Sequence, residues 1–187
     1  KRINEILEEE PSIQEIMEPY REPIQGDISF ENVSFVYPDS GIEALKGVDF
    51  ELKAGQKMAI IGRTGGGKTT IAELLLRNYD VQSGCIRIDG VDIKDFSTQH
   101  LRSALGYVPQ DSFLFSDTIS ANVAFGNPDA SQKEIEQYCQ HASIHQDILE
   151  LPDGYDTVVG ERGVTLSGGQ KQRISIARAL IKRPNFV

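Results

Sequence analysis

The first residues that could do chemistry form a glycine-rich octapeptide. Residues 62–69 read Gly-Arg-Thr-Gly-Gly-Gly-Lys-Thr and match the pattern G-x-x-x-x-G-K-[ST]. Glycines let backbone N–H groups wrap a phosphate chain, and a following helix adds the positive end of its dipole. Lys68 would bring a cation to the β- and γ-phosphates, and Thr69 a hydroxyl to Mg²⁺. The pattern predicts a nucleoside triphosphate site formed by Gly62, Arg63, Thr64, Gly65, Gly66, Gly67, Lys68, Thr69 and Thr70.

A second pair of glycines follows far along the chain, in Leu166-Ser167-Gly168-Gly169-Gln170. Ser167 is a natural helix N-cap, and the two glycines leave backbone N–H groups open at a helix start. This segment predicts a second anion site, made of Ser167, Gly168, Gly169 and Gln170.

With both motifs the sequence closely resembles an ATP-binding cassette (ABC) domain, whose signature is LSGGQ at a helix start. The resemblance covers residues 26–187. It implies an α/β fold with a P-loop NTPase core, an antiparallel β subdomain and a helical subdomain. In this family the signature of one subunit faces the P-loop of another, so the resemblance implies ATP and Mg²⁺ as cofactors and a second nucleotide-binding domain, identical or not, as a partner.

Three further positions match the family. Tyr37 stands where the family has an aromatic ring that stacks on adenine, although it could be an ordinary strand tyrosine. Gln110 matches the Q-loop residue, whose amide reaches Mg²⁺ and the attacking water; the resemblance thus implies Gln110 and Lys68 as catalytic residues, and Gln110 and Thr69 as metal ligands. Residues 159–163 match an exporter loop that contacts the membrane domain, and a simple charged turn is the alternative. Many members have Ser where this chain has Gly66.

A strand and a helix must hold the phosphate loop between them. The apolar run over 57–61 predicts a short buried strand that enters the loop, and a helix is expected from about 68 to 79. Before the loop, alternation predicts a half-buried strand over 28–37 with an irregularity near Asn32, and a second strand over 48–52.

Local signals place the remaining elements. Asp89-Gly90 predicts the turn of a hairpin over 85–93. Ser131, with Glu134 three residues later, predicts a capped helix start. A further strand is expected over 104–108, and helices over about 118–124, 131–142 and 167–182.

The two ends of the chain carry expectations of their own. Residues 1–25 resemble the connector that follows an exporter's last membrane helix, which implies a transmembrane domain as a partner, a transported solute, and a place at the cytoplasmic face of the cell membrane. Asn185–Val187 begin an apolar strand that in the family leads to Walker B, the D-loop and the H-loop. The 187-residue piece alone is therefore expected to hydrolyse ATP negligibly and to be marginally stable. Ile86–Asp89 has the same pattern of apolar residues followed by Asp as Walker B. Its place in a hairpin argues against this segment as a substitute for Walker B.

Composition narrows the function classes. The sequence has 19 Lys+Arg against 28 Asp+Glu, a net charge of −9, which argues against broad nucleic-acid binding. No run approaches the roughly 18 apolar residues of a membrane span. Two cysteines fit no disulfide framework. Cys139, His141 and His145 have metal-like spacing, although a small buried thiol on a polar helix is the favoured interpretation.

The resemblance implies the ATP-binding and ATP-hydrolysing motor domain of an ABC exporter, which couples ATP-driven dimerisation and hydrolysis to transport across a membrane. Three alternatives to this function are considered. A non-transport ABC ATPase of DNA repair or translation is disfavoured by the acidic balance and the exporter-like loop. A GTPase would need an Asn-Lys-x-Asp motif, which is absent from the sequence. A regulatory nucleotide-binding module without catalysis is the third. The transported solute cannot be identified, because membrane helices would select it.

Overall fold

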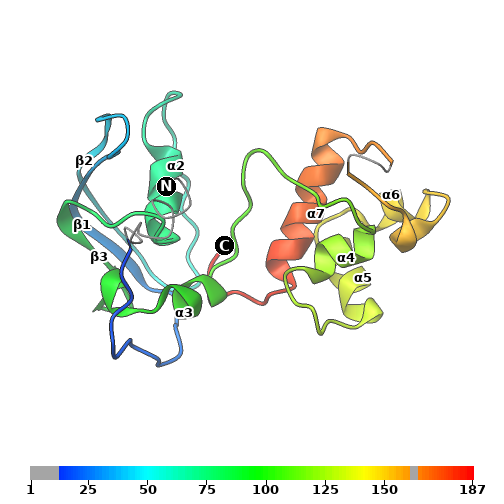
Figure 1. Cartoon of the computed structure of the whole chain (residues 1–187), viewed down its shortest axis with the longest axis horizontal. Coiled ribbons are helices and arrows are strands. Elements are labelled where there is room, and N and C mark those ends of the chain that lie inside the picture. Colours follow the sequence, from blue (N-terminus) through cyan, green and yellow to red (C-terminus); the bar gives the residue numbers. More distant parts are fainter. Residues whose placement is uncertain (1–12, 161–163) are drawn as a thin grey trace, which may run out of the picture. The chain divides into compact units, whose positions relative to one another are not determined.

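The computed structural model describes residues 13–160 and 164–187, and the chain divides into two compact units after Arg102 (Figure 1). Residues 1–12 of the expected connector lie outside the described residues, as do residues 161–163 of the exporter-like loop. No helix in the described part of the chain is long and apolar enough to cross a membrane.

The N-terminal unit is built on a four-stranded antiparallel sheet in the order β2-β1-β3-β4. The alternation expected along β1 is present, because Ile28, Phe30, Val33 and Phe35 are buried while intervening residues are more exposed. The strands are β1 (Ile28–Val36), β2 (Glu43–Leu52), β3 (Ser83–Ile88) and β4 (Val91–Asp92), and Figure 1 shows the first three side by side.

Two local features of this sheet agree with expectation. Asn32 has a φ of 49°, and the register of β1 shifts on either side of it. Asp89 and Gly90 both have positive φ, which suits the tight turn between β3 and β4. The Asp89 carboxylate accepts hydrogen bonds from the backbone N–H groups of residues 25–27, so this aspartate serves the fold, consistent with its rejection as a Walker B substitute.

Helix α2 (Lys68–Leu75) begins in the phosphate loop and ends earlier than the expected residue 79. Arg77 adopts a φ of 49°, which interrupts helical geometry. Its side chain is 2% exposed and donates to the carbonyl oxygens of Phe96, at 2.8 Å, and Gln14, at 3.2 Å. These bonds fix the helix end and also fasten the segment that precedes the sheet, although the expected boundary between residues 25 and 26 stays a prediction.

A short 3₁₀ turn, η1 (Ile93–Asp95), and helix α3 (Thr98–Ser103) complete the described N-terminal unit. Tyr20 donates its backbone N–H to the carbonyl of Asp95 at 2.8 Å, and its ring meets the edge of Phe96 at 5.1 Å. The leading segment therefore packs against this turn.

The buried strand expected over 57–61 is wrong for this structure. The segment has no strand geometry, and Met58, Ile60 and Ile61 are 41%, 44% and 94% exposed. A short apolar run becomes a buried strand only where neighbours pair with its backbone. No strand among the described residues pairs with this segment.

The strand expected over 104–108 is reduced to a single bridge, a second correction. Leu105 pairs in parallel with Phe186, and Gly106 donates to the Phe186 carbonyl at 2.9 Å. Asn185 donates to the Ala104 carbonyl at 2.8 Å.

The C-terminal unit is helical, and α4 and α5 lie beside α7 (Figure 1). The expected helices are confirmed within a few residues, and Ser131 with Glu134 forms the expected capping box. The elements are α4 (Ile119–Ala124), α5 (Gln132–His141), α6 (His145–Leu149), η2 (Gly154–Asp156) and α7 (Gly168–Leu180).

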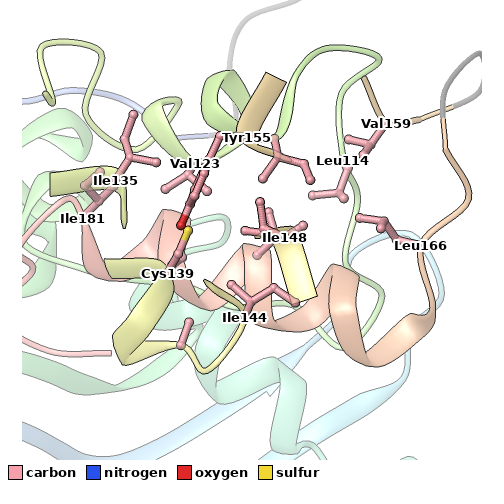
Figure 2. Close-up of a cluster of buried hydrophobic side chains, with 14 residues drawn as sticks. Leu114, Val123, Ile135, Cys139, Ile144, Ile148, Tyr155, Val159, Leu166 and Ile181 are labelled. Atoms are coloured by element: carbon pink, nitrogen blue, oxygen red, sulfur yellow. The ribbon is translucent and has the colours of Figure 1, made fainter. Parts of the chain in front are cut away.

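Cys139 is fully buried in the core of this unit, and burial raises the pKa of its thiol to about 11. Figure 2 shows the hydroxyl end of Tyr155 beside the Cys139 sulfur, and that hydroxyl lies 2.8 Å from His145 Nδ1. No group of three metal-ligating side chains occurs in the described part of the chain. The interpretation of Cys139 as a buried core thiol is confirmed.

Candidate nucleotide-binding site

The end of the phosphate loop requires glycine for the fold itself. Gly67 is the N-cap of α2 with a φ of 78°, and no side chain caps this helix. A Cβ at Gly67 would lie 2.4 Å from the Ala44 carbonyl oxygen and 2.8 Å from Leu45 Cδ2. Any larger residue would collide with β2, so glycine lets the loop enter the helix at this point.

The rest of the loop is open to solvent. Residues 62–66 are exposed, and a turn closes where Gly66 N–H donates to the Arg63 carbonyl at 3.1 Å. Gly65 has a φ of 79°, with nothing within 4 Å of an added Cβ. The loop thus presents an accessible backbone ahead of a helix N-terminus, which is the arrangement that binds phosphate.

Lys68 is held over this loop. Its Nζ donates to the carbonyl oxygens of Gly62, at 2.9 Å, and Arg63, at 2.7 Å. Thr69, the next residue, is exposed at the start of α2. The cation and the hydroxyl expected for phosphate and Mg²⁺ therefore stand together, and the loop fits a triphosphate.

Tyr37 lies against the same helix. Its hydroxyl is 3.0 Å from Oγ1 of Thr70, which is buried in the first turn of α2. The Tyr37 ring also meets Phe35 and Tyr79 edge-on, with centroids 5.0 Å and 5.4 Å away. The structure therefore places Tyr37 beside the phosphate loop, whereas its adenine contact stays a prediction. Nothing in the sequence predicted that Tyr79 packs against Tyr37.

The signature segment begins α7 in a different way. Ser167 Oγ accepts from Gln170 N–H at 3.2 Å, and Gln170 Oε1 accepts from Ser167 N–H at 3.0 Å. This reciprocal pair is a capping box, and it confirms Ser167 as the N-cap.

Neither signature glycine is required by packing. Gly168 has no atom within 4 Å of an added Cβ, and Gly169 has only Arg173 Nη1, at 3.9 Å. Neither residue has positive φ. Glycine in a helix costs about 0.5–1 kcal/mol relative to alanine, so the fold gains nothing from these two residues. Their backbone N–H groups therefore lie at a helix start that no bulky side chain of residues 168 and 169 covers.

Gln110 lies near this second site. It is exposed and lines a hollow of about 370 Å³ with Asp111, Ser112, Phe113, Gly168 and Lys171. The C-terminal unit therefore brings Gln110 to the signature of the same chain. Joint Mg²⁺ binding by Thr69 and Gln110 stays a prediction, because the two residues belong to different units.

Two features of the C-terminal unit were missed at the sequence level. Asp147 on α6 accepts hydrogen bonds from Gln170 Nε2 at 3.2 Å and Arg173 Nη2 at 2.6 Å. Phe113, Phe115 and Phe125 form an exposed aromatic cluster with adjacent centroids 5.2 Å and 4.7 Å apart. Residues so far apart along the chain carry no local signal of their contact.

Comparisons with known proteins identify the family of this chain. The family model described as "ABC transporter" matches residues 45–187. ATP-binding cassette sub-family B member 6 of Mesocricetus auratus is 47% identical over 186 residues, which cover 98% of this chain and 22% of the relative. The Bacillus subtilis protein named Probable multidrug resistance ABC transporter ATP-binding/permease protein YheI is 45% identical over 186 residues, which cover 100% of this chain and 32% of the relative.

A solved structure is similar in fold as well. The structure titled "Structure of a bacterial Atm1-family ABC exporter with ATP bound" matches with a TM-score of 0.91 and 44% identity, over 98% of this chain and 32% of that chain. The chain thus spans 22% to 32% of the length of these three proteins. The ABC ATPase fold expected from the two glycine motifs is confirmed, and the chain belongs to the ABC transporter family.

Proposed function

We propose that this chain binds Mg-ATP and forms the ATP-hydrolysing motor of an ABC exporter. The bare start of α7 is the observation that carries the proposal. Its glycines are unnecessary to the fold, since an added Cβ at Gly168 meets nothing, so their use lies in admitting a ligand. A second phosphate-binding helix start in one chain has a function when ATP lies between two copies.

The residues divide the work between them. The loop at 62–70 holds the phosphates, with Lys68 as the cation and Thr69 as a Mg²⁺ ligand. Bound Mg²⁺ would neutralise charge that develops during phosphoryl transfer. Tyr37 stacks on the adenine, and Gln110 orients the attacking water. Ser167, Gly168, Gly169 and Gln170 of the partner copy close over the γ-phosphate.

The motor needs a membrane domain, and the exposed aromatic cluster supplies a docking face. Phe113 and Phe125 are 66% and 63% exposed. Arg178 supports the cluster, because its guanidinium lies 5.4 Å from the Phe115 ring centroid and 5.9 Å from that of Phe125. Two apolar rings held rigidly in solvent favour a partner surface. A relative with the words "ATP-binding/permease protein" in its name supports a transmembrane domain as that partner.

The location and the cargo follow from that partner. The chain would work at the cytoplasmic face of a membrane, and the solute would be selected by the transmembrane domain. The 187-residue polypeptide on its own is proposed to turn over ATP negligibly, since it holds no Asp-Glu pair after an apolar strand.

ATP hydrolysis by the complete polypeptide that carries this chain, reconstituted in lipid vesicles, tests the proposal. We expect ATP-dependent solute uptake into inside-out vesicles and loss of turnover when EDTA removes Mg²⁺. Phe125→Ala should lower transport several-fold while leaving ATP binding intact, because it removes part of the docking face. ATP turnover stimulated by DNA or ribosomes, and indifferent to the membrane domain, would support the non-transport alternative instead.

A further inference from the structure

The signature helix start is held from outside by a residue of another helix. The Gln170 side chain closes the capping box through Oε1, which leaves its Nε2 to donate elsewhere. It donates to Asp147 Oδ2 at 3.2 Å. The same carboxylate oxygen accepts from Arg173 Nη2 at 2.6 Å.

Arg173 is placed where it affects the helix start. Its Nη1 is the atom that comes within 4 Å of a Cβ built on Gly169, at 3.9 Å. The guanidinium therefore folds back over the first turn of α7. Its Nε is buried and has no hydrogen-bond partner among the described residues. Within the described part of the chain, the bond to Asp147 is the contact that fixes this cation.

The helix that carries Asp147 is anchored in the hydrophobic core of the C-terminal unit. The next residue on α6, Ile148, is 1% exposed, and Ile174, next to Arg173 on α7, is fully buried in the same core. Figure 2 shows Ile148 among the core side chains of this unit. Since α6 and α7 share one core, the Asp147 carboxylate has a fixed position relative to the signature.

We infer that Asp147 is a positioning residue for the signature site, holding Gln170 and Arg173 so that the bare N–H groups of α7 keep the orientation that phosphate requires. This inference rests on the proposed function. The carboxylate does not touch nucleotide; it acts through two side chains that border the site. One amide and one guanidinium on one oxygen set both the cap geometry and the location of the local positive charge.

Three single variants of the complete polypeptide test the inference. Asp147→Ala removes both bonds, and Asp147→Asn keeps an acceptor oxygen without the charge. Glu150→Ala is the matched control, because Glu150 is exposed near the end of the same helix and its carboxylate has no hydrogen-bond partner among the described residues. We expect Asp147→Ala to lower kcat for ATP hydrolysis about threefold to tenfold, with Asn restoring most of it and the control unchanged.

Measuring ATP affinity and Tm beside kcat distinguishes a positioning role of Asp147 from a merely structural one. ATP affinity and Tm should stay at the wild-type values in all three variants, since the phosphate loop lies in the other unit. Unchanged kcat in Asp147→Ala would overturn the inference, as would a parallel loss of kcat and Tm. A rise of kcat in both Ala and Asn variants would also overturn it, because the charge would then act by repelling phosphate.

A signature variant keeps the two proposals distinguishable. Gly168→Asp is measured in the same assay. If it leaves turnover unchanged, the signature does not act on ATP and the proposed function fails. If it abolishes turnover while Asp147→Ala does nothing, the proposed function stands and the role of Asp147 fails.

Discussion

The two glycine-rich helix starts differ in whether the fold requires their glycines. In the phosphate loop, the fold itself demands glycine, because Gly67 has positive φ and lies where a Cβ would be 2.4 Å from the Ala44 carbonyl. In the signature, a side chain caps the helix, and Gly168 stands in open space. Packing and backbone geometry therefore require glycine at the first helix start and do not require it at the second.

The cations differ between the two sites in the same way. The Lys68 ammonium donates to carbonyl oxygens of its own loop in exposed hydrogen bonds, so a bound phosphate could replace these acceptors. Arg173 bonds to a carboxylate on another helix, so its charge stays where the fold puts it. Under the proposed function, the phosphate loop would rearrange around ATP, whereas the signature would present a fixed surface.

Gly67→Ala should have the largest effect on stability. The left-handed backbone costs an alanine about 1–2 kcal/mol, and the clash with β2 costs about 1–3 kcal/mol more. We expect the free energy of unfolding of the N-terminal unit to fall by about 2–5 kcal/mol, with ATP binding lost. Chemical denaturation of the complete polypeptide measures this free energy of unfolding. Wild-type stability would contradict the predicted clash between a side chain at Gly67 and the Ala44 carbonyl.

Gly168→Asp should separate function from stability. An acidic residue in the first turn of α7 favours the helix by about 0.3–1 kcal/mol, so stability should hold or rise. The same charge should repel phosphate and lower ATP turnover by about 100-fold. Steady-state hydrolysis and thermal unfolding are measured on one preparation. A loss of turnover that tracks a loss of Tm would mean that packing does require this glycine.

Lys68→Ala should weaken nucleotide binding with little effect on the fold. Charged hydrogen bonds to phosphate are worth about 1.5–3 kcal/mol, which corresponds to roughly 10- to 100-fold in Kd. Calorimetric titration with ATP measures this loss, and Lys133→Ala is the matched control, because Lys133 is exposed on α5 and belongs to neither glycine-rich helix start. An equal loss in the control would show that the weaker binding comes from the change in net charge and not from the phosphate loop.

The smallest effect concerns the core below the signature. The pKa of Cys139 is raised from 9.0 to about 11 by burial, so the folded thiol keeps its proton longer than the unfolded one. Stability that is fully present below about pH 9 is therefore lost as the pH rises through 11, by about 1–2 kcal/mol. The free energy of unfolding should therefore fall less steeply with pH over this range in Cys139→Ala than in the wild type. The same pH dependence in both proteins would mean that the thiol is exposed to solvent.

The sequence predicted features whose causes are local. The capping box at Ser131 and Glu134, the turn at Asp89 and Gly90, and the helix that starts after Ser167 each depend on a few adjacent residues, and all are present. Of these local features, the signature that begins α7 also supports the family assignment, together with the phosphate loop.

Features that depend on distant partners were not predictable. The run over 57–61 has the composition of a buried strand, but burial depends on neighbours, which the described residues do not provide. Nothing in α6 indicates that Asp147 meets α7, because that contact exists only once the shared core has formed.

Complementation between two defective copies tests the central claim most directly. Lys68→Ala and Gly168→Asp polypeptides are first measured alone, at an ATP concentration below the Kd expected for Lys68→Ala, where each should retain little turnover. The two variants are then assembled together. If one copy's phosphate loop works with the other copy's signature, each mixed dimer retains one intact site, and turnover should recover to about a quarter of the wild-type rate. Turnover no greater than that of either variant alone would show that each ATP is held within a single copy, which contradicts the account.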